Sequence, residues 1–268
     1  VLASLGRVLG DRGVLYKYQN PNYATVITVN RKPKHGAAPY LVVYLVDVVK
    51  GSILYQASHE NVGVNQPILA TQYENNVVYT FWSEGETSTS AKGYQVVSLE
   101  LETFSSFVNE RPHVLAQSFP FPHSPTAIGV TSTKAGISAK DILFGLSRQS
   151  VMALNKRYLD PRRPTGVPTA MEKEEMLIPY SGITDDPRLF LSYNLEVVGV
   201  RRIATAPTLL ESTTVVVAYG HDLFVTRHAP SKTFDILNED FSKSQLMLTI
   251  AVLVVVLFIT SPMVSGKT

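Results

Sequence analysis

One place in the chain begins like the zinc-binding motif of a metalloprotease, but the motif is incomplete. His59 and Glu60 are followed, at the position of the second histidine ligand, by Gly63. The chain has no cysteine, which removes thiolate nucleophiles, disulfides and cysteine zinc sites together. The histidines do not recur at the spacing that places two ligands on one helix face, so the sequence predicts no metal site. They are His35, His59, His113, His123, His221 and His228.

Two further arrangements resemble catalytic motifs without completing them. Gly145 and Ser147 have the spacing of a nucleophile elbow, but Gln149 stands where a second glycine is required. His221 and Asp222 are adjacent in a predicted strand turn, where such residues usually serve the turn itself. The sequence contains no glycine-rich phosphate loop. We therefore predict that the chain is not an enzyme and holds no cofactor.

Composition excludes other classes of function. The 268 residues include 24 basic and 22 acidic side chains, a formal net charge of +2, whereas nucleic-acid-binding domains carry a large, clustered positive excess. Hydrophobic residues make up 45% and charged residues 17%, so the chain is not intrinsically disordered. We therefore expect a folded protein that does not bind nucleic acid.

Many of the apolar residues lie near the C-terminal end. A charge-free run of about 19 residues, Leu246 to Val264, would span about 28 Å as a helix, close to the hydrocarbon thickness of a bilayer. No turn residue interrupts the run before Pro262, which disfavours the alternative of a buried strand pair or core helix. We predict a juxtamembrane segment at 242–245, a transmembrane helix at 246–264 and a short tail at 265–268. The candidate membrane-contacting residues are Leu246, Leu248, Ile250, Val252, Leu253, Val256, Leu257, Phe258 and Ile259.

The charges that flank this run indicate an orientation. Arg227, Lys232 and Lys243 precede it, and only Lys267 follows it, so the positive-inside rule would place the large N-terminal part in the cytoplasm. Long domains cross membranes regardless of such counts, so a body on the other side of the membrane stays open.

Residues 14–228 contain short β-branched and aromatic runs broken by turn residues, which predicts strands rather than helices. The runs form four repeated units, the first a four-stranded meander. Since four-stranded propeller blades repeat at about 40–50 residues, we predict an all-β fold of antiparallel blades that form part of a larger propeller. A β-sandwich is the alternative. The predicted strands are 14–19, 24–31, 40–47 and 52–59; 68–74, 77–83 and 94–100; 126–133, 142–147 and 151–156; and 202–206, 214–219 and 223–228.

A long insertion, 158–200, separates the last two units. Its prolines favour turns and extended backbone, and 169–177 has the composition of a short helix with Thr169 as its N-cap. Arg162 and Arg163 are candidate interface residues, because a guanidinium group forms planar, bidentate hydrogen bonds. The alternative is that both are solvated turn residues. The propeller portion with this insertion is assigned to 1–241.

Five stretches carry a family resemblance: YLVVYLVDVVKGSILYQASHENV (40–62), LDPRRPT (159–165), LIPYS (177–181), IATAPTLLEST (203–213) and VVVAYGHDLFVTRHAPSKTFDILNEDF (215–241). Followed by one apolar run, they resemble the C-terminal region of the family of subunit 1 of the endoplasmic reticulum (ER) membrane protein complex. The resemblance covers essentially the whole chain. It implies a lumenal β-propeller body, a single membrane span and a cytoplasmic C-terminus, which is opposite to the orientation that the flanking charges indicate.

The resemblance also implies a function. It points to a scaffold subunit of a complex that supports insertion of tail-anchored and multi-pass proteins into the ER membrane. The implied partners are other subunits of that complex, client membrane proteins and membrane lipid.

Two alternatives from other classes stay open. A membrane-anchored propeller enzyme, for example a quinone-dependent dehydrogenase, would need cation ligands and a general base that converge on a central channel. A propeller receptor for a lumenal or extracellular ligand would need a binding rim, and some of the 13 tyrosines and 11 phenylalanines are available for one.

Overall fold

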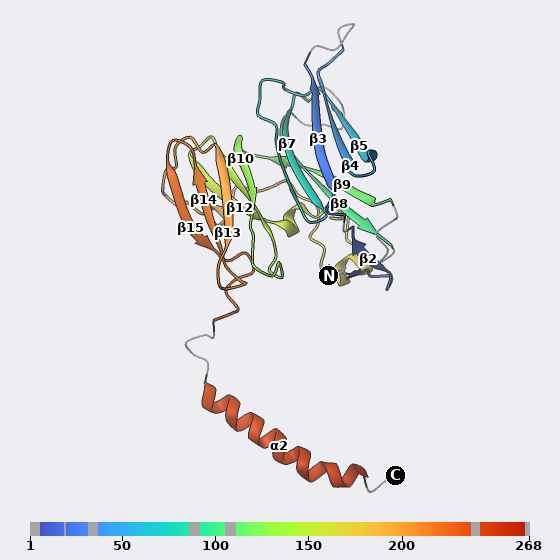
Figure 1. Cartoon of the computed structure of the whole chain (residues 1–268), viewed down its shortest axis with the longest axis vertical. Coiled ribbons are helices and arrows are strands. Elements are labelled where there is room, and N and C mark those ends of the chain that lie inside the picture. Colours follow the sequence, from blue (N-terminus) through green and yellow to red (C-terminus); the bar gives the residue numbers. More distant parts are fainter. Residues whose placement is uncertain are drawn as a thin grey trace. The chain divides into compact units, whose positions relative to one another are not determined.

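The computed structural model describes residues 6–18, 20–31, 37–85, 92–104, 111–236 and 242–265. The chain divides into two compact units, 1–232 and 233–268, and each is described by itself (Figure 1). The described strands all belong to the first unit, and the long helix α2 belongs to the second.

The strands form four sheets in which every pair is antiparallel. Sheet 1 contains β3–β5, sheet 2 contains β1, β2 and β6–β9, sheet 3 contains β10–β12, and sheet 4 contains β13–β15. These sheets and one long apolar helix confirm the predicted fold class. The bounds are β1 Gly6–Val8, β2 Val14–Lys17, β3 Tyr23–Asn30, β4 Tyr40–Asp47, β5 Ser52–Glu60, β6 Leu69–Tyr73, β7 Asn76–Ser83, β8 Gly93–Thr103, β9 His113–Phe121, β10 Pro125–Val130, β11 Asp141–Leu146, β12 Ser150–Asn155, β13 Arg202–Pro207, β14 Thr214–Tyr219 and β15 Leu223–His228.

The prediction of one four-stranded meander over residues 14–59 is wrong in one strand. Strand β2 pairs with β1 and β8 instead of β3, which leaves sheet 1 with three strands. The reason lies in the length of β8. Strand β7 covers one edge of β8 as far as Glu100, and β2 takes the last part of β8, where Tyr16 lies opposite Thr103.

Strand β9 was not among the predicted strands, and it extends the predicted group of strands at 68–100. It pairs with β8 along its whole length, so that β6–β9 make a four-stranded antiparallel set. Pro120 lies within β9 opposite Gln95, and proline within a run of residues argues against an interior strand. It is tolerated here because β9 is an edge strand.

The two inner sheets bury both of their faces, because successive side chains of a strand point to opposite sides. In β8, Leu99 packs against sheet 1, whereas Val96 packs against Phe144 of sheet 3. The neighbour of Phe144, Leu143, packs against sheet 4. The hydrophobic clusters therefore connect the sheets in the order 1, 2, 3, 4, which is how propeller blades stack.

The insertion between sheets 3 and 4 covers part of this core. Leu159, Ile183 and Phe190 belong to the cluster that joins sheets 2 and 3. The predicted helix is confirmed as the shorter α1, Ala170–Glu174, with Thr169 and Glu172 forming a capping box. Two 3-10 turns, η2 at Lys156–Leu159 and η3 at Pro187–Leu189, flank it.

Helix α2 runs from Lys243 to Ser265 and forms most of the described second unit. It begins three residues before the predicted span. Residues 243–245 of the predicted juxtamembrane segment therefore belong to the first turn of the helix. Of the predicted tail at 265–268, only Ser265 lies within the described residues, as the last residue of the helix.

Candidate interface regions: an apolar helix and an arginine-lined pocket

Helix α2 is long and apolar enough to cross a membrane. Its window from Lys243 to Thr260 has a mean hydropathy of 2.1. The nine predicted membrane-contacting residues are all exposed, from 46% at Leu246 to 73% at Phe258. The helix therefore presents an apolar surface that lipid or other apolar helices can cover.

Two threonine hydroxyls of α2 are satisfied within the helix. The Thr249 hydroxyl donates to the Gln245 carbonyl at 2.8 Å, and the Thr260 hydroxyl donates to the Val256 carbonyl at 2.8 Å. Such internal bonds leave little polar demand on the surroundings. The helix suits an anchor more than the wall of a hydrophilic path.

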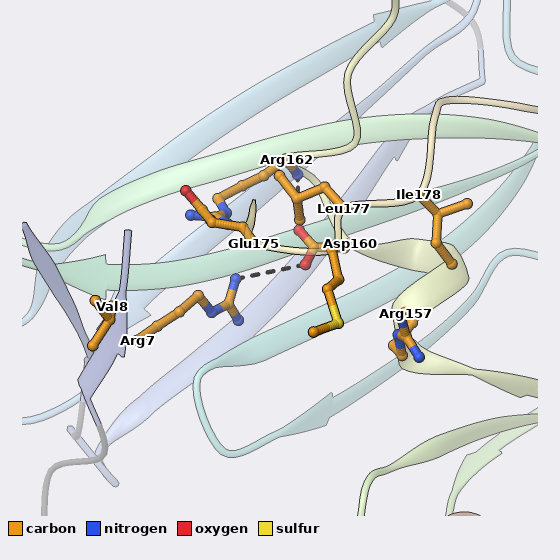
Figure 2. Close-up of a pocket in the computed structure, with 9 residues that line it drawn as sticks. Arg7, Val8, Arg157, Asp160, Arg162, Glu175, Leu177 and Ile178 are labelled. Atoms are coloured by element: carbon orange, nitrogen blue, oxygen red, sulfur yellow. Dashed lines mark hydrogen bonds and ion pairs between the residues drawn. The ribbon is translucent and has the colours of Figure 1, made fainter. Parts of the chain in front are cut away.

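The first unit contains a pocket of about 390 Å³ that three segments build (Figure 2). Strand β1 contributes Arg7 and Val8, the segment through and after η2 contributes Arg157, Asp160 and Arg162, and the chain after α1 contributes 175–178. Three arginines and two carboxylates therefore surround one cavity.

Arg162, one of the two predicted interface residues, forms part of this wall. Its guanidinium pairs with Glu175, whose other oxygen accepts a hydrogen bond from the backbone NH of Gly10 at 2.8 Å. The backbone NH of Arg162 donates to Asp160 at 2.9 Å. The Nε of Arg162 is buried and has no hydrogen-bond partner among the residues that the structure describes. Arg162 thus connects the turn after η2 to the end of α1 while retaining one unused donor.

Arg163, the other predicted interface residue, points into the protein. It is 3% exposed, and it donates to the carbonyls of Tyr158 at 2.7 Å, Ile178 at 3.1 Å and Pro179 at 2.5 Å. It also lies over the ring of Phe119. Burial lowers the pKa of Arg163. The alternative of a solvated turn residue is therefore wrong for Arg163, and the interface role of the two arginines stays a prediction.

Behind the pocket lies a buried acidic pair that the sequence analysis did not single out. Glu100 and Glu102 alternate along β8, so both point to the same face, and they are 0% and 1% exposed. Arg7 contacts Glu100 at 2.8 Å, and Lys156 contacts it at 3.0 Å from the start of η2. Asp160 lies 3.6 Å from Arg7. Glu100 therefore ties β1 and the start of η2 to β8.

The two carboxyls titrate in opposite directions. Burial and the neighbouring Glu100 carboxylate raise the pKa of Glu102 to about 8. Burial also opposes ionisation of Glu100, but Lys156 and Arg7 outweigh it and lower its pKa overall. The same ion pairs act on the cation: burial opposes the charge of Arg7, yet Glu100 and Asp160 raise its pKa overall. Glu100 is thus the ionised member of the pair and Glu102 the protonated one at neutral pH.

We expect Glu102→Gln to remove a pH dependence of local stability. The folded chain keeps Glu102 protonated up to about pH 8, whereas the ordinary carboxyl ionises near 4.5. Between these values the folded state binds more protons, so the free energy of unfolding falls as the pH rises. The glutamine variant lacks this slope and gains on the order of 2–4 kcal/mol relative to the parent across the window.

Native-state hydrogen exchange of the β8 amides, corrected for intrinsic exchange rates, measures this effect at pH 5 and pH 8. Glu174→Gln makes the same side-chain replacement on the exposed part of α1, outside the buried pair, and serves as the control. Parallel slopes in the parent and in Glu102→Gln would contradict the raised pKa of Glu102.

Two residues of the incomplete motifs, Asp222 and His59, form contacts within the fold. The Asp222 carboxylate accepts from the backbone NH of Val198 at 2.8 Å and so holds its turn. The imidazole of His59 lies 2.6 Å from the hydroxyl of buried Tyr79. Among the described residues, no three histidine, aspartate or glutamate side chains converge as a metal site.

The chain is similar to a known protein family and to individual members of it. The family described as ER membrane protein complex subunit 1, second beta-propeller, matches residues 1–231. The chain is 35% identical over 283 residues to ER membrane protein complex subunit 1 of Schizosaccharomyces pombe, covering 100% of this chain and 30% of that protein. It is 39% identical over 249 residues to the Xenopus laevis protein of the same name, covering 89% and 24%. The chain thus spans about a quarter to a third of the length of these relatives.

Among solved structures, a chain of Kuenenia stuttgartiensis hydrazine synthase aligns at 13% identity over 76% of this chain and 56% of that one. The TM-score of that superposition is 0.42, which is too low to bear on function.

Proposed function

The chain belongs to the family of ER membrane protein complex subunit 1, and from this membership we propose that it is a non-enzymatic scaffold held in the ER membrane by α2. The stacked sheets would dock other subunits of that complex on the lumenal side. Helix α2 would pack among lipid and neighbouring spans, and the C-terminus would lie in the cytoplasm.

The observation that carries this proposal is the uniformly apolar surface of α2. No charged residue occurs between Lys243 and the end of the window at Thr260. A helix that conducted a hydrophilic client would carry polar groups facing a cavity. We therefore assign this chain to assembly and anchoring, in support of a complex that inserts tail-anchored and multi-pass clients.

Co-purification tests the function. The full-length protein that contains this chain, tagged and extracted in mild detergent, should elute as a stable multi-subunit membrane assembly. A monomer with quinone-dependent redox activity would favour the enzyme alternative, and a monomer that binds a soluble lumenal ligand would favour the receptor alternative. Either of these results would overturn the scaffold proposal.

A single substitution tests the lumenal placement. Glu196→Thr creates the sequence Asn-Leu-Thr at 194–196, an acceptor for N-glycosylation. Asn194 is exposed, and its neighbours Tyr193 and Leu195 are 83% and 65% exposed, so the transferase can reach the site. We expect a glycosidase-sensitive increase in mass on most of the protein.

Adding Asn194→Gln to that variant removes the acceptor without changing the rest, and the increase in mass should disappear. An unglycosylated Glu196→Thr protein that is correctly folded would place the body on the cytoplasmic side, as the flanking charges alone indicate.

A further inference from the structure

The pocket of Figure 2 contains more hydrogen-bond donors than the chain itself uses. Arg7 gives Nη2 to Glu100, while its buried Nη1 has no hydrogen-bond partner among the described residues and forms only a longer ion pair with Asp160, at 3.6 Å. Arg162 pairs with Glu175 through Nη2, while its Nε is also buried and has no hydrogen-bond partner within the part of the chain that the structure describes. A buried donor without an acceptor carries a desolvation penalty of about 1–3 kcal/mol, which a ligand with an acceptor oxygen would relieve.

Arg157 adds a charge that no ion pair among the described residues neutralises. Its side chain lines the cavity and is exposed, and its recorded hydrogen bond, to the Asn155 side chain, is made by its backbone NH. Among the described residues, the pocket carboxylates are already engaged elsewhere: Asp160 by Arg7 and the Arg162 backbone, and Glu175 by the Arg162 guanidinium. Three guanidinium groups therefore face two carboxylates, and the balance is one positive charge.

The remaining wall is apolar and partly open. Val8 is 67% exposed and Met176 is 75% exposed, and Leu177 and Ile178 complete the lining. Charged and apolar side chains thus share a cavity of about 390 Å³, near the lower end of the range for specific ligand sites. Such a cavity has room for an acidic side chain and one apolar neighbour.

We propose that this pocket binds the carboxylate of one Asp or Glu on an extended segment of a partner protein, with an adjacent apolar side chain against Val8 and Met176. The proposal rests on the scaffold function, since it specifies what one docking site of the scaffold recognises. Guanidinium groups bind carboxylates in planar, bidentate geometry. A phosphate would carry more negative charge next to Asp160 and Glu175, so the carboxylate is the better match.

The test uses the full-length protein in its detergent-solubilised complex, with a photo-crosslinking amino acid in place of Met176. Mass spectrometry of the cross-linked product identifies the bound segment, which we expect to contain an Asp or Glu beside an apolar residue. Arg157→Glu should lower the cross-link yield by at least about tenfold, because it reverses the unneutralised charge. Lys173→Glu, the same change at an exposed α1 residue outside the pocket lining, should leave the yield within about twofold.

Replacing the identified partner carboxylate by arginine should restore cross-linking to Arg157→Glu. Three outcomes would overturn the proposal: cross-links to lipid only, cross-links to a segment without a carboxylate, and a yield that does not respond to Arg157→Glu. An intact complex without the cross-link would refute the pocket assignment alone. Loss of the complex in the parent protein would refute the scaffold function itself.

Discussion

Replacing Arg163 by methionine should destabilise the insertion at 158–200 by at least about 3 kcal/mol, because several carbonyl groups around this buried guanidinium lose their common donor. These acceptors are the carbonyls of Tyr158, Ile178 and Pro179, and Ser181 contributes both its hydroxyl and its carbonyl. Methionine fills a similar volume but donates no hydrogen bond. The chain before α1 and the chain after it would then lose their main polar connection.

Arg163→Lys separates geometry from charge. Lysine keeps the charge but lacks the planar fork that reaches carbonyls on two segments at once, so its effect should be intermediate. Hydrogen exchange and limited proteolysis of residues 158–200 in the full-length protein measure the loss. Arg188→Met is the control, since the Arg188 side chain is 89% exposed. Equal protection in Arg163→Met and the parent would contradict this role.

The second large effect concerns the membrane helix. Leu253→Arg should shift the free energy of membrane insertion by about 3–4 kcal/mol, since central leucine contributes about −0.5 and central arginine about +3 on an insertion scale. The whole span is favourable by only about 4–7 kcal/mol on that scale. Adding Val256→Arg should therefore bring insertion to about balance or reverse it, and leave most of the chain translocated rather than anchored.

Glycosylation acceptors placed on both sides of α2 distinguish inserted from translocated chains in microsomes. Leu246→Arg is the matched control, because an arginine near a helix end can extend to the interface at much lower cost. Normal insertion of the doubly substituted chain would show that α2 is not held in place by its own hydrophobicity.

The local sequence was sufficient to predict the strands of sheets 3 and 4. It was insufficient where a strand pairs with another that lies far away in the sequence. Strands β11 and β12, or β14 and β15, are joined by short turns, so that each strand finds its partner next to it. The pairing of Tyr16 with Thr103 depends on how much of β8 is left uncovered by β7, which no local pattern records. The edge position that makes Pro120 acceptable in β9 is equally a property of the assembled sheet.

The site was only partly predictable for a similar reason. The membrane span could be predicted from the sequence, because its prediction depends only on the length and composition of the apolar run. Arg162 and Arg163 are adjacent residues of the same type, yet their surroundings differ. Arg162 lines a pocket, whereas Arg163 is held by carbonyl groups from the segment that follows α1. A usable signal existed for the acidic pair: Glu100 and Glu102 alternate with the apolar Leu99 and Leu101 near the end of β8, which indicates carboxyls that need cationic partners if that strand is buried.

The pairing of β2 with β8 also has a consequence for the order of events during synthesis. As the chain emerges from the ribosome, sheet 1 can close once Glu60 is available, because its three strands are consecutive. Sheet 2 must wait until Phe121 at the end of β9, although its first strands were made earliest. The hairpin of β1 and β2 therefore stays without its main partner, β8, while sheet 1 forms, so its pairing edge is left open until β8 has been synthesised.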